Sequence, residues 1–374
     1  MPNQPAKIRD PWFDNAKMAL VMLVVVGHSW TLLPHNVVND QAYDFLYFWH
    51  VPAFVFVTGY LSRSFNWSSA RLVALVRTVV VPYVLFETAL ALFRVYVGGE
   101  QLEDLFRDPH WPMWYLSALF FWRLMTPVFR PLRGGLLVAI VLSLVAGLWV
   151  GDTLDVARVL GLLPFFVLGL KATPERLALL RGRPPLKVAA VLTLVGLVVL
   201  AHWTDGWATT EWLYYRSEYA ALESSDARAV LVRAAVLVLG TVGAWAFLSL
   251  VPRVGGWFAT MGSASLVVYL FHGFVVKGLE YSAYPDWAAA HPVLSLPLTT
   301  LGAMALALVL AWQPVARRLG VLVDPVGFAQ AHVRHAMDLT RATAETEEHA
   351  EALADAIAEA EEHGRPTPGT EPVR

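Results

Sequence analysis

Residues 14–30, DNAKMALVMLVVVGHSW, form the stretch that decides the fold class. Its apolar run is long enough to be part of a membrane-spanning helix, yet it carries Asp14, Lys17 and His28. At ~100° per residue, Lys17 and His28 fall within ~20° of one azimuth and Asp14 within ~40° of His28, so all three share one face. Lys17 and His28 are ~16 Å apart along the helix axis. Ionisable side chains are costly inside a membrane and therefore indicate a functional site on this face.

The composition of the chain indicates an integral membrane protein. Its 374 residues are 57% hydrophobic and 16% charged, and the mean hydropathy is +0.51, which is too apolar for a soluble domain. The 15 tryptophans and 12 tyrosines suit the aromatic belts at membrane interfaces. The absence of cysteine excludes disulfides, thiolate metal sites and a catalytic thiol. No cleavable signal peptide is expected, because the first apolar run carries charges and lacks a small-residue cleavage site.

Several apolar runs are long enough to cross a bilayer, which predicts an all-α polytopic membrane protein with about ten transmembrane helices. The transmembrane domain is expected to cover about residues 9–320. The sixth run is short and ends in Gly-Leu-Lys. The predicted spans are roughly 16–33, 43–62, 72–93, 113–130, 135–150, 157–170, 187–203, 229–250, 257–281 and 293–316.

Lysine and arginine residues are concentrated on one side of these spans. The loops on the side of the N-terminus hold most of them, whereas the opposite loops hold few, mixed with many acids. The positive-inside rule therefore places both termini in the cytoplasm, in a multi-pass protein of the cell membrane. An even number of spans agrees with that orientation.

The chain changes character from Asp324 onward. Residues 324–374 contain eleven acidic and four basic side chains, and the stretch ATAETEEHAEALADAIAEAEEHG is rich in Ala and Glu. This pattern predicts an acidic cytoplasmic tail, partly helical, with a disordered end. A helix exposed to solvent explains this composition. A helix that binds a partner, or that associates with a second copy of the chain in a homo-oligomer, is the alternative. No internal repeat is evident, which argues against a transporter built from inverted halves.

Three histidines, His28, His50 and His272, are predicted at a similar depth, about 8–15 Å below the outer surface. A neutral imidazole at His28 can take a proton from a hydroxyl as a general base or accept an acyl group as a nucleophile, and the sequence leaves both roles open. Each histidine has an alternative role as a buried interhelical hydrogen-bonding residue. Pro52 removes an amide donor and predicts a kink beside His50.

Cationic side chains mark the cytoplasmic end. Arg71 and Arg77 begin the third span, and two cations near the inner face suit phosphate binding. Ordinary positive-inside anchoring also explains them. Asp14 can orient Lys17, or both can face a polyanion at the cytoplasmic mouth; snorkelling at a helix start is the alternative.

Polar and aromatic side chains further along are candidate substrate contacts. Glu87 lies deep in the third span and needs a partner or a proton, with Arg123 as a candidate partner. Trp111, Trp114 and Tyr115 open the fourth span. An aromatic belt explains these rings, and a lid over a sugar-binding cleft is the functional alternative.

At these positions the sequence resembles the membrane acyltransferase 3 family. Asp14, Lys17 and His28 match its first-helix signature, a basic residue followed by ten residues and a histidine. The second span, FWHVPAFVFVTGYL, is similar to the family's phenylalanine-histidine-hydrophobic-proline-phenylalanine segment, followed by a small residue, glycine and tyrosine. The resemblance covers about residues 9–318 and is closest to the fucose 4-O-acetylase-like branch. It also includes Arg71, Arg77, Pro82, the triplet Trp114, Tyr115 and Leu116, and the segment Tyr269, Leu270, Phe271 and His272.

The resemblance implies an O-acyltransferase that moves an acetyl or other short acyl group from cytoplasmic acyl-CoA to a hydroxyl of a sugar, glycan, glycolipid or glycosylated small molecule. The expected partners are these substrates and the lipid bilayer, and neither a metal nor a nucleic acid is expected. A transporter or flippase of a polar lipid or glycoconjugate is the alternative, and a sensor that signals through the acidic tail leaves the aligned histidines unexplained. The implied site residues are His28 and His50 for catalysis, Asp14, Lys17, Arg71 and Arg77 for the donor, and Trp114, Tyr115, Glu87 and His272 for the acceptor.

Overall fold

The computed structural model confirms the predicted all-α polytopic class. It describes residues 10–102, 109, 111–148, 150, 153–180, 184–330, 333, 337, 345–346, 348–350 and 352–355, and within these ranges every regular element is helical. The chain divides into two units, Met1–Val323 and Asp324–Arg374. Most of the predicted acidic tail, 324–374, lies outside the described residues, and so does its end, which is expected to be disordered.

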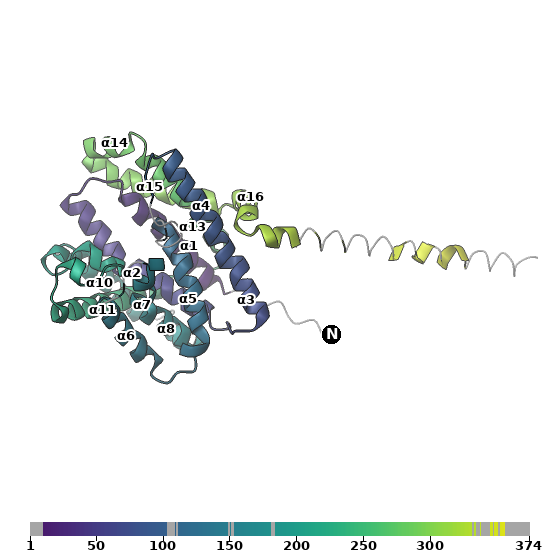
Figure 1. Cartoon of the computed structure of the whole chain (residues 1–374), viewed down its shortest axis with the longest axis horizontal. Coiled ribbons are helices and arrows are strands. Elements are labelled where there is room, and N and C mark those ends of the chain that lie inside the picture. Colours follow the sequence, from purple (N-terminus) through teal and green to yellow (C-terminus); the bar gives the residue numbers. More distant parts are fainter. Residues whose placement is uncertain are drawn as a thin grey trace, which may run out of the picture. The chain divides into compact units, whose positions relative to one another are not determined.

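The first two helices lie within the first unit and carry the candidate site. Helix α1 (Pro11–Trp30) begins at Asp10, whose carboxylate accepts a hydrogen bond from the Trp12 amide at 3.0 Å. Helix α2 (Val37–Leu61) begins after Asn36, which caps it in the same way. The two helices pack on each other, and further helices pack around them (Figure 1). These are α8 (Leu163–Lys171) and α11 (Asp226–Leu250) on α2, and α13 (Ser265–Glu280) and α15 (Pro292–Ala311) on α1. Most side chains of α1 are therefore buried.

Five helical stretches of the described residues are long and apolar enough to cross a membrane. A sixth candidate is a pair of helices bent by 54°, Thr153–Gly161 and Leu163–Lys171. That the chain has ten membrane spans stays a prediction. The five stretches are Ser69–Tyr96, Pro184–Ala201, Asp226–Leu250, Trp257–Glu280 and Pro292–Ala311.

Prolines explain where helices depart from the predicted spans. The predicted span 72–93 contains a π-helical turn, η1 (Val76–Val80), just before Pro82; a proline ring clashes with the carbonyl four residues earlier, and a wider turn relieves the clash. The predicted span 157–170 is broken at Leu162, before Pro164. The last predicted span, 293–316, ends at Ala311 instead, and Trp312 is extended. Pro314 has no amide hydrogen to bond the carbonyl of Leu310 and its ring clashes with that carbonyl, so the helix cannot continue through it.

The remaining elements complete the helical unit. Helices α3 and α4 lie at one side in the view of Figure 1, and α10 and α11 pack against each other on the other side. Short 3-10 segments occur mainly in the connections. The bounds are α3 (Ser69–Leu75), α4 (Val81–Tyr96), η2 (Trp111–Met113), α5 (Trp114–Phe129), α6 (Gly135–Ala146), η3 (Thr153–Asp155), α7 (Val156–Gly161), α8 (Leu163–Lys171), α9 (Pro174–Leu180), α10 (Pro184–Ala201), η4 (Thr204–Gly206), η5 (Thr210–Tyr214), η6 (Ala220–Leu222), α11 (Asp226–Leu250), α12 (Trp257–Met261), η7 (Gly262–Ala264), α13 (Ser265–Glu280), α14 (Tyr284–Ala290), α15 (Pro292–Ala311) and α16 (Gln313–Val323).

Two glycines allow α2 and α8 to cross in backbone contact. A Cβ atom added to Gly59 would lie 2.0 Å from the carbonyl oxygen of Phe166, and one added to Gly169 would lie 1.9 Å from the carbonyl oxygen of Phe56. Small residues at helix crossings are typical of membrane proteins, where close backbone approach supplies the packing energy. This reciprocal contact fixes α2, and with it the side chains of α2 that line the site.

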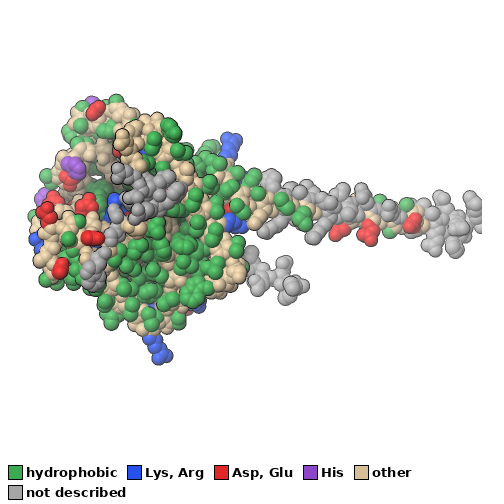
Figure 2. All heavy atoms as spheres, viewed as in Figure 1, with side chains coloured by type: hydrophobic (Ala, Val, Ile, Leu, Met, Phe, Trp, Pro, Cys, Tyr) green, Lys and Arg blue, Asp and Glu red, His purple; other side chains and the backbone are tan. Residues whose placement is uncertain are grey.

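The surface of the helical unit is largely apolar. Figure 2 shows hydrophobic side chains over most of the visible face, while acidic side chains gather at the left edge, near the ends of α10 and α11. Exposed apolar side chains are normal where a helix faces lipid, and their position on long apolar helices agrees with a membrane protein. Examples are Val188, Leu192, Leu231, Val238, Val293 and Leu301.

Candidate active site

Helix α1 carries the predicted polar face without interruption. Nζ of Lys17 lies 2.8 Å from Oδ1 of Asp14, and both side chains are largely buried. His28 lies about three helical turns further along, near the C-terminal end of α1. The helix therefore presents an ion pair at one end of this face and an imidazole at the other, as the spacing predicts.

His28 and His272 form a hydrogen-bonded pair. Nδ1 of His28 lies 2.8 Å from Nε2 of His272, and Nδ1 of His272 lies 3.1 Å from the carbonyl oxygen of Val268, one turn earlier in α13. Because a carbonyl only accepts, Nδ1 of a neutral His272 carries the proton and its Nε2 is an acceptor. His28 then donates from Nδ1, which leaves the lone pair of its own Nε2 available. These hydrogen-bond partners assign the tautomers of both neutral rings.

His50 has a similar arrangement on α2. Its Nδ1 lies 2.8 Å from the carbonyl oxygen of Leu46, so Nδ1 donates and Nε2 is the acceptor in the neutral ring. The side chain is buried, and the ring of Tyr47 lies edge-on to it at 4.7 Å between centroids. Pro52, two residues later, lies inside a helix that continues to Leu61. His28 and His50 thus bring two imidazoles, each with an accepting Nε2, to one site.

A cavity of about 250 Å³, here called the outer cavity, is lined by both His28 and His50. Aromatic rings make up much of its wall and a few charged groups complete it, a composition typical of small-molecule sites. Trp114 and Tyr115, predicted as substrate contacts, are among these rings. The aromatic lining residues are Tyr43, Tyr47, Phe54, Trp111, Trp114, Tyr115, Tyr214 and Tyr269.

Trp111 packs against the histidine pair. Its ring centroid lies 4.6 Å from that of His28 and 6.1 Å from that of His272. Its backbone has φ 42°, a left-handed conformation that is rare for a bulky residue and persists only where the surroundings hold it. The neighbouring carbonyl of Pro112 accepts a hydrogen bond from the Tyr269 hydroxyl, which holds this turn in place.

Arg158, at the start of α7, is a cavity residue that the sequence analysis did not select. Its Nη1 lies 3.3 Å from Oδ1 of the buried Asp155, and its Nε donates to the carbonyl oxygen of Tyr214 at 3.3 Å. The guanidinium carbon lies 5.0 Å from the centroid of the Trp114 ring. Arg158 therefore places a positive charge in the wall of the outer cavity. The sequence carried no signal for this role beyond a basic residue at the start of the predicted span 157–170.

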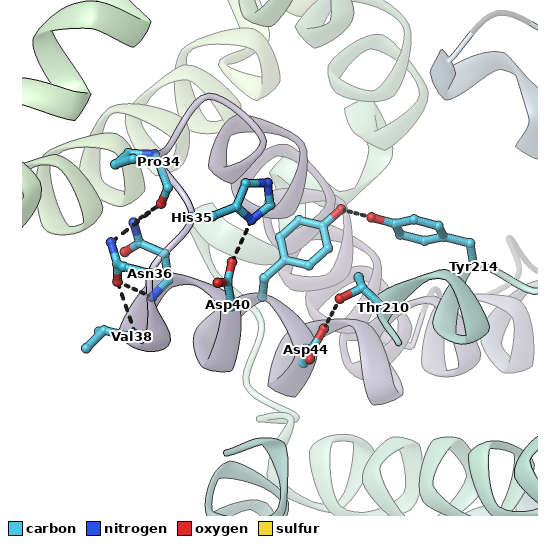
Figure 3. A network of polar contacts seen from close by, with 10 residues as sticks. Pro34, His35, Asn36, Val38, Asp40, Asp44, Thr210 and Tyr214 are labelled. Atoms are coloured by element: carbon cyan, nitrogen blue, oxygen red, sulfur yellow. Dashed lines mark hydrogen bonds and ion pairs between the residues drawn. The ribbon is translucent and has the colours of Figure 1, made fainter. Parts of the chain in front are cut away.

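The segment between α10 and α11 supplies four further lining residues that sequence reasoning missed, Glu211, Leu213, Tyr214 and Arg216. Two hydrogen bonds tie this segment to α2 (Figure 3). Thr210 donates to Asp44 at 2.8 Å, and the hydroxyls of Tyr43 and Tyr214 lie 2.9 Å apart. The same helix that carries His50 therefore also positions this wall of the cavity.

A second cavity of about 240 Å³, here called the inner cavity, lies at the Lys17 end of the polar face. Lys17 and Arg123 give it a cationic lining, and Thr78 and Ser265 add hydroxyls. Phe54, Tyr115 and Tyr269 belong to the walls of both cavities. The two cavities thus adjoin each other, with His28 and His50 in one and Lys17 in the other.

The structure places the other predicted site residues away from these walls. Arg71 is exposed and interacts electrostatically with Arg123, and Arg77 lies in the π-helical turn beside Thr78, but neither belongs to the described lining of the outer or the inner cavity. Glu87 is fully buried in α4, also away from the described lining of both cavities. His272 is fully buried behind His28 and does not face the outer cavity.

Comparison with protein-family models assigns residues 10–312 to the acyltransferase domain of the acyltransferase 3 family. Comparisons with curated proteins and with solved structures gave no match. The match covers most of the chain and includes the helices that carry the paired histidines and both cavities. It favours an acyltransferase over the transporter and sensor alternatives. The chain belongs to the acyltransferase 3 family and is a multi-pass membrane acyltransferase.

Proposed function

We propose that this protein is an O-acyltransferase that moves an acetyl or other short acyl group from cytoplasmic acyl-CoA to a hydroxyl of a carbohydrate-containing acceptor. The observation that carries the proposal is the hydrogen bond between His28 and His272, which assigns the tautomer of His28. Its Nδ1 is occupied by the hydrogen bond to His272, and the ring lines the outer cavity, so the accepting Nε2 is suited to take a proton from a bound hydroxyl.

The transfer needs one base and no further reactant. Nε2 of His28 removes the proton of the acceptor hydroxyl while the hydroxyl oxygen attacks the thioester carbonyl carbon. A C–O bond forms, the C–S bond breaks, and the proton passes from His28 to the departing CoA thiolate. The products are the acyl ester of the acceptor and free CoA. His50, whose Nε2 also accepts, orients the acceptor through a second hydroxyl.

The inner cavity suits the donor. Lys17 and Arg123 line it, so two cations face a bound donor. Arg71, which interacts electrostatically with Arg123, and Arg77, next to the lining residue Thr78 in the sequence, are further candidate phosphate contacts. The ~16 Å between Lys17 and His28 matches the reach of an extended pantetheine arm. In this arrangement the phosphates stay at the cytoplasmic mouth and only the thioester approaches His28.

The outer cavity suits the acceptor. A sugar ring has apolar faces and an edge of hydroxyls, and the cavity offers aromatic faces together with imidazole, guanidinium and carboxylate groups. Trp114, with Arg158 beside it, forms such a mixed surface. Cavity residues of this kind fix the orientation of a polar ligand through a few hydrogen bonds while rings provide most of the contact area.

The test uses inverted membrane vesicles from the native cells, deleted for the gene and supplied with it in trans. Such vesicles contain the natural acceptor and expose the donor side to added [¹⁴C]acetyl-CoA. The wild-type protein should transfer label into a base-labile ester, and His28→Gln should reduce the initial rate by about 100-fold or more, because an amide cannot act as a base. The control is His35→Gln, at a side chain that is 97% exposed, and it should leave the rate unchanged.

Two results would contradict the proposal. Label that enters no ester in wild-type vesicles, from acetyl-CoA or from butanoyl- or hexanoyl-CoA, would reject acyl transfer from CoA. Near-normal transfer by His28→Gln, with the protein present at wild-type level, would reject His28 as the base and direct attention to His50.

A further inference from the structure

Three aromatic side chains separate the outer cavity from the inner one. Phe54 of α2, Tyr115 of α5 and Tyr269 of α13 line both cavities. The rings of Phe54 and Tyr115 have centroids 5.0 Å apart, and those of Tyr115 and Tyr269 have centroids 5.5 Å apart. We call these three side chains the ring partition. Because each comes from a different helix, the partition lies where three helices meet.

Two of the three rings are held by their hydroxyl groups. The Tyr115 hydroxyl is hydrogen-bonded to Oγ1 of Thr58, which itself lies 2.9 Å from the carbonyl oxygen of Phe54 in the same helix. The Tyr269 hydroxyl donates to the carbonyl of Pro112. Phe54 has no polar side-chain atom, so packing alone fixes its ring. The ring partition therefore consists of Tyr115 and Tyr269, whose hydroxyls are hydrogen-bonded, and Phe54, whose ring is held by packing only.

We infer that the ring partition selects the acyl group by its length, and that Phe54 sets the limit. The inference rests on the proposed function, in which the donor occupies the inner cavity and the acceptor the outer one. The thioester carbon must reach His28 while the phosphates remain near Lys17, so the acyl chain has to pass beside these rings.

The size of the acyl group then decides how much the partition must open. An acetyl group adds one methyl beyond the carbonyl, whereas each further methylene has to fit among packed rings or take space from the acceptor in the outer cavity of about 250 Å³. Forcing extra methylenes into a packed site shifts side chains from their preferred positions. One methylene commonly changes enzyme specificity by about tenfold or more. Short acyl groups should therefore react well and long ones poorly.

The rings can instead be ordinary packing between helices. In that case truncation of Phe54 lowers stability or activity for every donor by the same factor, because no donor touches it. A change in the ratio of rates between a long and a short donor separates the two explanations, since a general loss of active protein cancels in the ratio.

The experiment measures the initial rate of transfer from acetyl-, butanoyl-, hexanoyl- and octanoyl-CoA, labelled in the acyl group, in the vesicles described above. The variants are Phe54→Ala and the milder Phe54→Leu. The matched control is Val51→Ala, on the same helix one turn earlier, which lines the outer cavity but is not part of the inner lining among the described residues. Phe54→Ala should raise the hexanoyl-to-acetyl ratio by about tenfold or more.

Each outcome decides the inference. Phe54→Leu should move the ratio in the same direction by a smaller factor, and this result suffices if Phe54→Ala fails to accumulate. An unchanged ratio in a Phe54 variant that still transfers acetyl groups rejects the inference and leaves the proposed function intact. An equal shift in Val51→Ala also rejects it, because the space in the outer cavity would then set the limit. Absence of transfer from every donor by the wild-type protein rejects both.

Discussion

Nδ1 of His28 lies 2.8 Å from Nε2 of His272, and the second ring is in turn fixed by the backbone of α13. His272 therefore lies behind the outer cavity rather than in its wall, and it decides which nitrogen of His28 is left to accept a further hydrogen bond. A group that holds a catalytic imidazole in one tautomer is a recurring feature of acyl-transfer enzymes, where a carboxylate more often does this. Here a neutral ring takes that place.

Loss of the hydrogen bond between His28 and His272 should lower the turnover without weakening donor binding. His272→Phe removes the acceptor for Nδ1 of His28, so the ring can take the wrong tautomer and kcat should fall by about 10- to 100-fold, with KM for acyl-CoA unchanged. His272→Gln keeps a carbonyl oxygen that can accept from His28 and should recover part of the rate. Initial rates over a range of acyl-CoA concentrations give kcat and KM separately. Equal rates for His272→Phe and the wild type would show that the pair is a packing contact.

Arg123 should contribute to donor affinity. A hydrogen bond to a charged phosphate is a strong contact, so Arg123→Gln should raise KM for acyl-CoA by about tenfold or more, with a smaller effect on kcat. Arg77→Gln should have a weaker effect in the same direction, because Arg77 does not line the described cavity. The measurement is KM at low and at high salt, and the effect of salt should be smaller in Arg123→Gln. Arg133→Gln, at an exposed position, is the control; an unchanged KM for Arg123→Gln would remove this residue from the donor site.

The two cavities should open to opposite sides of the membrane. The chain has no cysteine, so a single introduced thiol reports on one position without background. Thr31→Cys lies in the outer cavity and Ser265→Cys in the inner one. A membrane-impermeant maleimide should label Thr31→Cys in intact cells and Ser265→Cys only in inverted vesicles. The proposed orientation has both termini in the cytoplasm, and the reverse labelling pattern would overturn it.

Glu100 should make the stability of the protein depend on pH in the acid range. Burial opposes ionisation, but hydrogen bonds from Arg94 and Tyr281 and the charge of Lys277 outweigh it and lower the pKa of this carboxyl from 4.5 to about 2. A pKa lower in the folded than in the unfolded state gives stability that is complete above about pH 4.5 and is lost as the pH falls toward about 2.

The measurement is the unfolding temperature of the purified protein, followed by tryptophan fluorescence between pH 6 and pH 3. Glu100→Gln should unfold at a lower temperature than the wild type at pH 6, and this difference should shrink on acidification. Glu280→Gln is the control, because Glu280 also contacts Lys277 but is more exposed than Glu100. A difference that stays constant with pH would show that the Glu100 charge contributes no stability.

Local periodicity explains what could be predicted from the sequence. The face shared by Lys17 and His28 follows from helical geometry alone, because α1 is one uninterrupted helix. Trp114 and Tyr115 were selected because large rings at a span end are conspicuous, and both line the outer cavity. The helix breaks near Pro82 and Pro164 also have a local cause, and attention to these prolines would have refined the spans.

Contacts between distant segments explain what could not be predicted. His272 was expected to contact substrate, but its position behind His28 depends on how α13 packs against α1. Arg158 is held at the cavity by the carbonyl of Tyr214, 56 residues further along the chain, and Thr210 is tied to Asp44 across 166 residues of sequence. No periodicity within one helix carries such information. Whether Arg71, Arg77 and Glu87 take part in function stays a prediction.

The interlocked backbones of α2 and α8 have a mechanical consequence. With Gly59 against Phe166 and Gly169 against Phe56, neither helix can slide or rotate past the other without a clash of main-chain atoms. They form a rigid frame, and Phe54 belongs to it. The Tyr115 hydroxyl is hydrogen-bonded to Thr58 of the same frame, and the Tyr269 hydroxyl to the carbonyl of Pro112. Passage of a thioester therefore requires Tyr115 or Tyr269 to move and breaks at least one of these hydrogen bonds.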